Sequence, residues 1–124
     1  MKRTMDAAEI EEITGVDIGE HASNPNNVFL LADRGGFGFE WRGPGYYEAH
    51  SFFAPGSRGT HRIRSGREAL DIMRDEYGAV FIWGGTPLDN VAARVFNKAC
   101  GFALIEKRWL PERGDCGIYL KRLI

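Results

Sequence analysis

Two side chains that can move protons stand two residues apart in the segment Tyr46–Phe53. The segment has the character of a β-strand, and in a strand Glu48, His50 and Phe52 fall on one face. An imidazole titrates near neutral pH, so His50 is the better candidate general base, and Glu48 is close enough to act directly or through water. The alternative is that both are polar side chains of the surface or core with no part in chemistry.

A basic turn follows this strand and opens a helix. It reads Pro55-Gly56-Ser57-Arg58-Gly59-Thr60-His61 and is followed by Arg62. The first N–H groups of a helix have no partner within the helix, and the helix dipole is positive at that end, so the turn suits an anionic phosphate. An ordinary solvated helix start is the competing interpretation.

Turn signals and apolar periodicity predict the elements that would position these groups. A helix is expected over residues 6–14, ended by Gly15, and strands are expected over 28–33, 37–42 and 46–53, joined as antiparallel hairpins. In the second of these strands Glu40 lies on the face opposite Phe39 and Trp41, so we expect it to be exposed to solvent.

The second half of the chain is predicted as helix, strand, helix and two strands. A helix runs to Tyr77 and starts at either Thr60 or Gly66. A strand over 79–83 is broken by the two following glycines, and a helix begins at Thr86, runs to Gly101 and buries an apolar stripe of Leu88, Ala92, Val95 and Ala99. Strands over 103–110 and 116–123 complete a single α+β domain, residues 1–124, with a mixed, mostly antiparallel central sheet flanked by helices.

Composition excludes several classes of protein. The chain has 124 residues, is 44% hydrophobic and has a net charge of −1, which argues against a general nucleic-acid or membrane-surface protein. The basic cluster of the turn and the helix after it also lacks the interleaved aromatic residues of a nucleic-acid interface; it consists of Arg58, His61, Arg62, Arg64 and Arg67.

No apolar leader or membrane-length segment occurs, so Cys100 and Cys116 are expected to be reduced thiols in the cytoplasm. No cysteine or histidine spacing indicates a metal site.

The order of elements resembles the Gcn5-related N-acetyltransferase (GNAT) fold over residues 28–124, with a shortened N-terminal part. The family has a Gln/Arg-x-x-Gly-x-Gly/Ala turn, matched here by Arg58-Gly59-Thr60-His61-Arg62-Ile63 with bulky residues at both small positions. It also has Asn-x-x-Ala and Gly-Phe, matched by Asn90-x-x-Ala93 and Gly101-Phe102, whereas Asn97 stands where the family has a tyrosine that protonates the departing thiolate. The pattern is also similar to compact GNAT-like proteins encoded in phage and prophage genomes.

The resemblance implies transfer of an acetyl group from acetyl-CoA directly to an amine acceptor, with His50 or Glu48 taking the amine proton. It implies that the cofactor lies between the third and fourth of the strands expected here and is bound by a set of residues from the third strand, the turn and the last helix: Phe53, Arg58, Gly59, Thr60, His61, Arg62 and Asn90. An open cleft would favour this function. A cleft filled by His61, Ile63 or Trp83 would favour the alternative, a non-catalytic structural, assembly or regulatory protein with the same fold. The apolar C-terminal strands also suggest a homodimer.

Overall fold

The structure, a computed structural model, describes residues 1–54, 56–57 and 59–124. Its elements in chain order are β1 (Lys2–Arg3), α1 (Ala7–Thr14), α2 (Gly19–Ser23), β2 (Val28–Ala32), β3 (Gly35–Gly43), β4 (Tyr46–Phe53), α3 (Gly59–Tyr77), β5 (Phe81–Pro87), α4 (Val91–Ala99), β6 (Ala103–Leu110) and β7 (Gly114–Arg122). The predicted fold class is confirmed, and the two-residue β1 agrees with a shortened N-terminal part.

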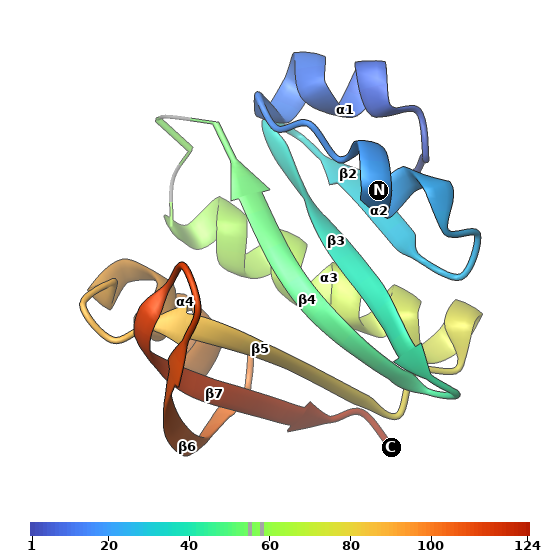
Figure 1. The fold of residues 1–124 in the computed structure, drawn as a ribbon. Helices are drawn as coiled ribbons and strands as arrows, with labels where there is room; N and C mark the ends of the chain where they lie inside the picture. The colour runs from blue at the N-terminus through green and yellow to red at the C-terminus, as the bar shows by residue number, and fades with distance from the viewer. Residues whose placement is uncertain (55, 58) are drawn as a thin grey trace.

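The seven strands found in the described residues belong to one twisted sheet in the order β1-β2-β3-β4-β5-β7-β6 (Figure 1). Neighbouring strands are antiparallel except for β4 and β5, which are parallel. The parallel pair is possible because α3 carries the chain back across the sheet between them. The three antiparallel strands predicted from residue 28 onward form β2, β3 and β4.

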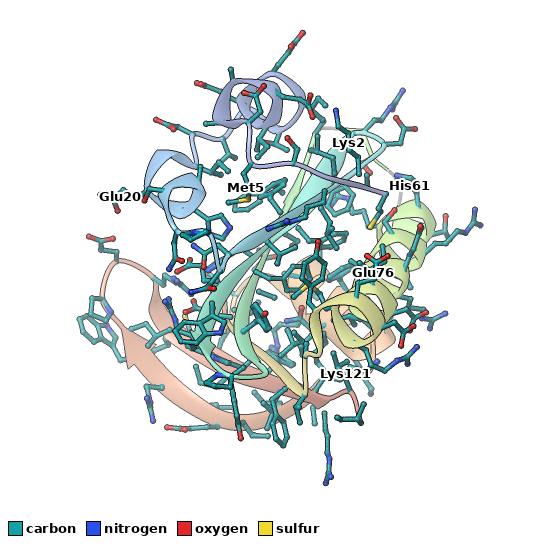
Figure 2. The ribbon with its side chains drawn as sticks, turned by 90° about the vertical axis from the view of Figure 1, so that its right-hand side faces the viewer. Lys2, Met5, Glu20, His61, Glu76 and Lys121 are labelled. Carbon is teal, nitrogen blue, oxygen red and sulfur yellow. The ribbon has the colours of Figure 1, made fainter. Side chains whose placement is uncertain are left out.

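Helices cover both faces of the sheet. On one face α3 packs on β2 and β3 through a core that includes Val28, Leu30, Phe37, Phe39, Leu70 and Met73. On the other face α1 and α2 cover a smaller core of Ile10, Ile18, Phe29 and Leu31. Figure 2 shows Glu20, on α2, and His61, on α3, on opposite sides of the sheet. Among the described residues, none of the helices combines the length and the hydrophobicity needed to cross a membrane.

The first helix begins and ends as its sequence predicts. The Asp6 side chain accepts hydrogen bonds from the N–H groups of Ala8 and Glu9, which satisfies two donors that an α-helix leaves free at its N-terminus. Gly15 ends the helix in the left-handed conformation, with φ of 76°. The five-residue α2 that follows was not predicted, because the segment offers neither a periodic apolar pattern nor a capping side chain.

The prediction that β5 stops at two glycines is wrong. β5 continues through Gly84 and Gly85 to Pro87, pairing with β7 throughout. The glycines allow close packing: a Cβ on Gly84 would lie 3.2 Å from the carbonyl oxygen of Ala49, and one on Gly85 would lie 2.8 Å from Leu110 Cδ1. Pairing with β7 therefore overrides the local preference of a glycine pair for a turn.

The predicted start and buried face of α4 are also wrong. Thr86 is part of β5, and the side chain of Asn90 caps the helix by accepting a hydrogen bond from the N–H of Ala93 at 3.1 Å. The predicted core residue Val95 is 60% exposed, and Ala92 is exposed as well. The helix instead packs through Phe96, whose ring stacks on that of Phe37 at 6.3 Å.

Candidate active site

The two parallel strands separate after three residue pairs. Tyr46, Tyr47 and Glu48 of β4 lie opposite Phe81, Ile82 and Trp83 of β5. Beyond this point β4 stays paired with β3, and β5 stays paired with β7, so the two strands diverge (Figure 1). In the described part of the chain, the edges that face each other across the divergence have no strand between them. Their backbone groups are therefore available to a ligand.

A cleft of about 280 Å³ occupies the divergence. Its walls come from β4, β5, α3, α4 and β7, and its lining includes Ala49, His50, Gly84, Gly85, Thr86, Asn90, Ala93, Asn97 and Tyr119. Trp83 lines the cleft, whereas His61 and Ile63 do not. Ile63 instead packs against the main core from the first turns of α3. The bulky residue at this family glycine position therefore does not fill the cleft, which is open.

A second, larger hollow of about 960 Å³ lies on the α2 side of the sheet. It is lined by polar groups that include Asp17, Glu20, His21, Asn27, Glu40 and Arg42. His50 and Phe52 line both this hollow and the cleft between β4 and β5. His50 therefore lies between two cavities on different sides of the sheet, where its imidazole can be reached from either one.

A charged network surrounds the His50 ring. Nε2 of His50 lies 2.9 Å from Oε1 of Glu40 and 3.3 Å from Oε2 of Glu48. The guanidinium of Arg42 lies 2.8 Å from the remaining oxygen of each carboxylate. Arg113 lies in the turn just before β7, and its Nη2 is 3.6 Å from Oε2 of Glu48. Each carboxylate therefore contacts the imidazole with one oxygen and Arg42 with the other.

The side chain of Glu48 is held in its ionised form. It is 7% exposed, and its polar contact with His50 is the main cause that lowers its pKa, to about 2. Burial acts in the opposite direction, and the hydrogen bonds from Arg42 lower the pKa further. A carboxylate with this pKa is a weak base at neutral pH. Of the two predicted catalytic residues, His50 is thus the better proton acceptor, and Glu48 is suited to stabilise its protonated form.

The three groups Glu40, Glu48 and His50 also have the donor types of a divalent metal site, with ligand atoms within 4.8 Å of one another. Both carboxylates, however, are already paired with the guanidinium of Arg42. A metal ion would have to compete with that guanidinium, so we interpret the cluster as an acid–base network.

The predicted phosphate-binding residues that the structure describes gather at the N-terminus of α3, outside the cleft. Gly59 and Thr60 are exposed in the first turn of the helix. His61 donates to the carbonyl oxygen of Asp33 at 2.8 Å, and the guanidinium of Arg62 lies 5.4 Å from the ring centre of Phe53. Figure 2 shows His61 at this end of the helix. The predicted residue Arg58 lies outside the described residues.

Two asparagines, one at the N-cap of α4 and one within the helix, line the cleft. Asn90, a predicted cofactor-binding residue, also serves as the helix cap described above. Asn97, at the position of the family tyrosine, donates from Nδ2 to Oγ1 of Thr86 at 2.9 Å. This hydrogen bond ties α4 to the end of β5 across the cleft wall. The side-chain amides of Asn90 and Asn97 thus each form a hydrogen bond within the protein, and both residues line the cleft.

Sequence reasoning missed several groups of the site. Glu40 is only partly exposed and contacts His50, which corrects the expectation that it is solvated. Glu40 is opposite Glu48 in the hairpin, so counting residues back through the turn would have predicted this contact.

His21 has its pKa lowered mainly by burial, and it comes from the unpredicted α2. Tyr119, whose hydroxyl accepts a hydrogen bond from Nε of Arg94 at 3.2 Å, gave no signal in the sequence.

Comparison with solved structures supports the fold that this geometry suggests. The structure superposes on a GNAT-family acetyltransferase from Bacillus anthracis with a TM-score of 0.68 and 16% identity, covering 96% of this chain and 84% of that one. A Desulfovibrio desulfuricans protein assigned to the same family gives a TM-score of 0.70 at 18% identity, with 99% and 98% covered. A Salmonella typhimurium protein solved with its cofactor acetyl-CoA gives 0.64 at 15%, covering 79% of this chain and 64% of that chain.

No protein-family model matches the chain, and no curated protein matches it in sequence. The structural likeness nevertheless extends over nearly the whole chain. The protein therefore has the GNAT fold, the fold of acetyltransferases, with the divergence of β4 and β5 as its central opening.

Proposed function

We propose that the protein is an N-acetyltransferase that transfers an acetyl group from acetyl-CoA directly to an amine. The observation that carries the proposal is the position of His50, which lines both the cleft and the hollow. One cavity would hold the acetyl donor and the other the acceptor, so that the two substrates meet at a group able to take a proton. Holding two reactants in this way supplies much of the rate of a transfer reaction.

The residues present fit the donor. The unpaired edges of β4 and β5 offer backbone groups to the amides of a pantetheine chain, and the cleft between them is open. The free N–H groups at the start of α3, together with His61 and Arg62, would hold its phosphates, and the sequence assigns Arg58 to the same role. Acetyl-CoA supplies the acetyl group as an activated thioester.

Proton transfer is assigned to three side chains. His50 takes the proton from the acceptor amine as the nitrogen bonds to the acetyl carbon and the carbon–sulfur bond breaks, and the ionised Glu48 stabilises the resulting imidazolium. The departing sulfur needs a proton, which Asn97 cannot supply. Tyr119 lines the same cleft and uses its oxygen to accept from Arg94, so its own O–H proton is free to be donated.

The hollow suggests which amines to test first. The side chains of Asp17, Glu20 and Glu40 place carboxylates along its lining, whereas Arg42 is paired with Glu40 and Glu48. A second positive charge on the acceptor would be attracted to these carboxylates. Diamines and polyamines therefore belong at the head of an acceptor screen.

Calorimetric titration with acetyl-CoA and with CoA tests the proposal. We expect dissociation constants in the micromolar range. Ala93→Phe would fill the cleft and abolish binding, whereas Ala92→Phe, on the exposed face of the same helix, would leave binding unchanged. Absence of binding at millimolar ligand would refute the function. Binding without turnover on any amine would instead favour the non-catalytic alternative.

A further inference from the structure

Tyr119 stands at the wall of the cleft, on the face of the sheet that α4 covers. It is 6% exposed, lines the cleft, and lies directly opposite Gly84 of β5 in the pairing of β5 with β7. Directly opposite residues share a face of the sheet. A side chain on Gly84 would therefore stand between the Tyr119 ring and β4, where its Cβ would lie 3.2 Å from the carbonyl oxygen of Ala49. The glycine thus leaves the ring open to the cleft.

Two hydrogen bonds hold the guanidinium of Arg94 beside the Tyr119 hydroxyl. Arg94 lies in the middle of α4; its Nε donates to Oη of Tyr119 at 3.2 Å, and its Nη1 donates to the carbonyl oxygen of Leu88 at 3.1 Å. Other arginines, such as Arg42 and Arg108, are paired with carboxylates, whereas Arg94 has no such partner among the described residues. Its positive charge is therefore directed at the phenol oxygen.

This contact determines how Tyr119 can use its proton. An oxygen that accepts a hydrogen bond from Arg94 turns its own O–H away from the guanidinium, and the described part of the chain offers that hydrogen no acceptor. A phenol that gives up its proton becomes an anion, and a hydrogen bond from a guanidinium to an anion is stronger than one to a neutral oxygen. The contact with Arg94 therefore favours donation of the proton.

We propose that Arg94 is the positioning residue that makes Tyr119 the proton donor to the departing sulfur, an inference that rests on the proposed acetyltransferase function. The O–H bond of Tyr119 breaks as its proton passes to the sulfur and the carbon–sulfur bond breaks, and the phenolate stays paired with Arg94. The proton that His50 took from the amine then returns to Tyr119 through solvent. The acid thus comes from β7, whereas Asn97 of α4 is hydrogen-bonded to Thr86.

A double-mutant cycle on kcat, measured with the best amine of the screen, tests the inference. A residue that acts through Tyr119 has no effect once the hydroxyl is gone. We expect Tyr119→Phe to lower kcat about 10²-fold and Arg94→Gln to lower it about tenfold, with the affinity for CoA unchanged in both. The double variant should be no slower than Tyr119→Phe alone. Arg94→Lys keeps the charge and a donor, so it should retain more activity than Arg94→Gln.

Lys98→Gln is the matched control, since it removes a positive charge from an exposed position of the same helix that lines neither the cleft nor the hollow. It should leave kcat unchanged, and circular dichroism of each variant checks that the fold is retained. An Arg94→Gln enzyme with full kcat, or a double variant in which the two losses multiply, would overturn the role of Arg94 alone. A wild-type protein that binds CoA but acetylates no amine would refute the proposed function itself, and the proton donor with it.

Discussion

At the scale of single residues, His50 is the group on which the proposed chemistry depends. Replacing it with glutamine keeps its size and polarity but removes the ability to accept a proton. We expect His50→Gln to lower kcat/KM by about 10²- to 10⁴-fold, the usual contribution of a general base, while the affinity for CoA stays unchanged. Steady-state kinetics with the best amine of the screen and calorimetry with CoA measure the two effects.

His61→Gln provides a contrasting substitution of the same kind. His61 lies outside both cavities, at the start of α3, so this variant is expected to weaken CoA binding and leave kcat near the wild-type value. A His50→Gln enzyme that keeps full kcat would remove His50 from the reaction and leave the acid–base network without its proposed role.

The charge of Glu48 has a consequence for stability. Its pKa falls from an ordinary 4.5 to about 2 in the folded protein, so it stabilises the fold fully above pH 4.5, and this contribution is lost as the pH falls toward 2. Glu48→Gln leaves Arg42 with a weaker partner and is expected to cost about 1–3 kcal/mol at pH 7. Urea denaturation at a series of pH values should show the difference between wild type and variant shrinking below pH 4.5. A constant difference would mean that the carboxylate is not the source of the effect.

At the scale of elements, the close packing of α3 on α4 forms one wall of the cleft. A Cβ on Gly66 of α3 would lie 2.9 Å from Sγ of Cys100 and 2.9 Å from Cζ of Phe96, so the two helices would have to move apart. We expect Gly66→Ala to lower the free energy of unfolding by about 1–2 kcal/mol, because the cost of overpacking exceeds the gain in helix propensity. Denaturant titration measures the change.

Gly59→Ala is the matched control, since Gly59 belongs to the same helix and a Cβ there meets no atom of the described residues within 4 Å. It should leave stability unchanged or raise it slightly. If both substitutions had the same effect, the contact between the helices at Gly66 would not limit their approach.

The elements differ in how far the sequence predicts them. The bounds of β4 and β6 are those expected, because each strand lies between clear turn signals. The end of β5 and the start of α4 were misplaced because Gly84, Gly85 and Thr86 match the local pattern of a turn and a helix cap, while pairing with β7 keeps them in a strand. Local signals cannot reveal a pairing with residues thirty positions later in the chain, roughly the span of one supersecondary unit.

The sequence predicted the two site residues that share one strand, but it did not predict those that come from other elements. A period of two along one strand suffices to place Glu48 beside His50, and the structure confirms that they share a face. The other partners come from different elements: His21 from α2, Arg113 from the turn before β7 and Tyr119 from β7 itself. Their convergence depends on the order of strands in the sheet, which a periodic pattern does not contain. Sequence reasoning therefore found the residue that we propose as proton acceptor without most of its surroundings.

At the scale of the whole molecule, the sheet consists of two parts joined by a short seam. The strands β1 to β4 form one part and β5, β7 and β6 the other, and the parallel pairing between them involves three residues of each strand. The parts are also held together by the shared core beneath α3, which includes Phe39 and Ile82. Past the seam, the backbone of each part faces an opening instead of a neighbouring strand.

A molecule bound along that opening would connect the two parts of the sheet, because it could form hydrogen bonds with both strand edges that the divergence leaves unpaired. Amide hydrogens on the facing edges, within residues 49–53 of β4 and 84–87 of β5, are expected to exchange with solvent faster than those at the seam, since opening there breaks fewer contacts. Adding CoA should slow exchange on both edges together. The cleft would then make the rigidity of the sheet itself depend on the concentration of its ligand.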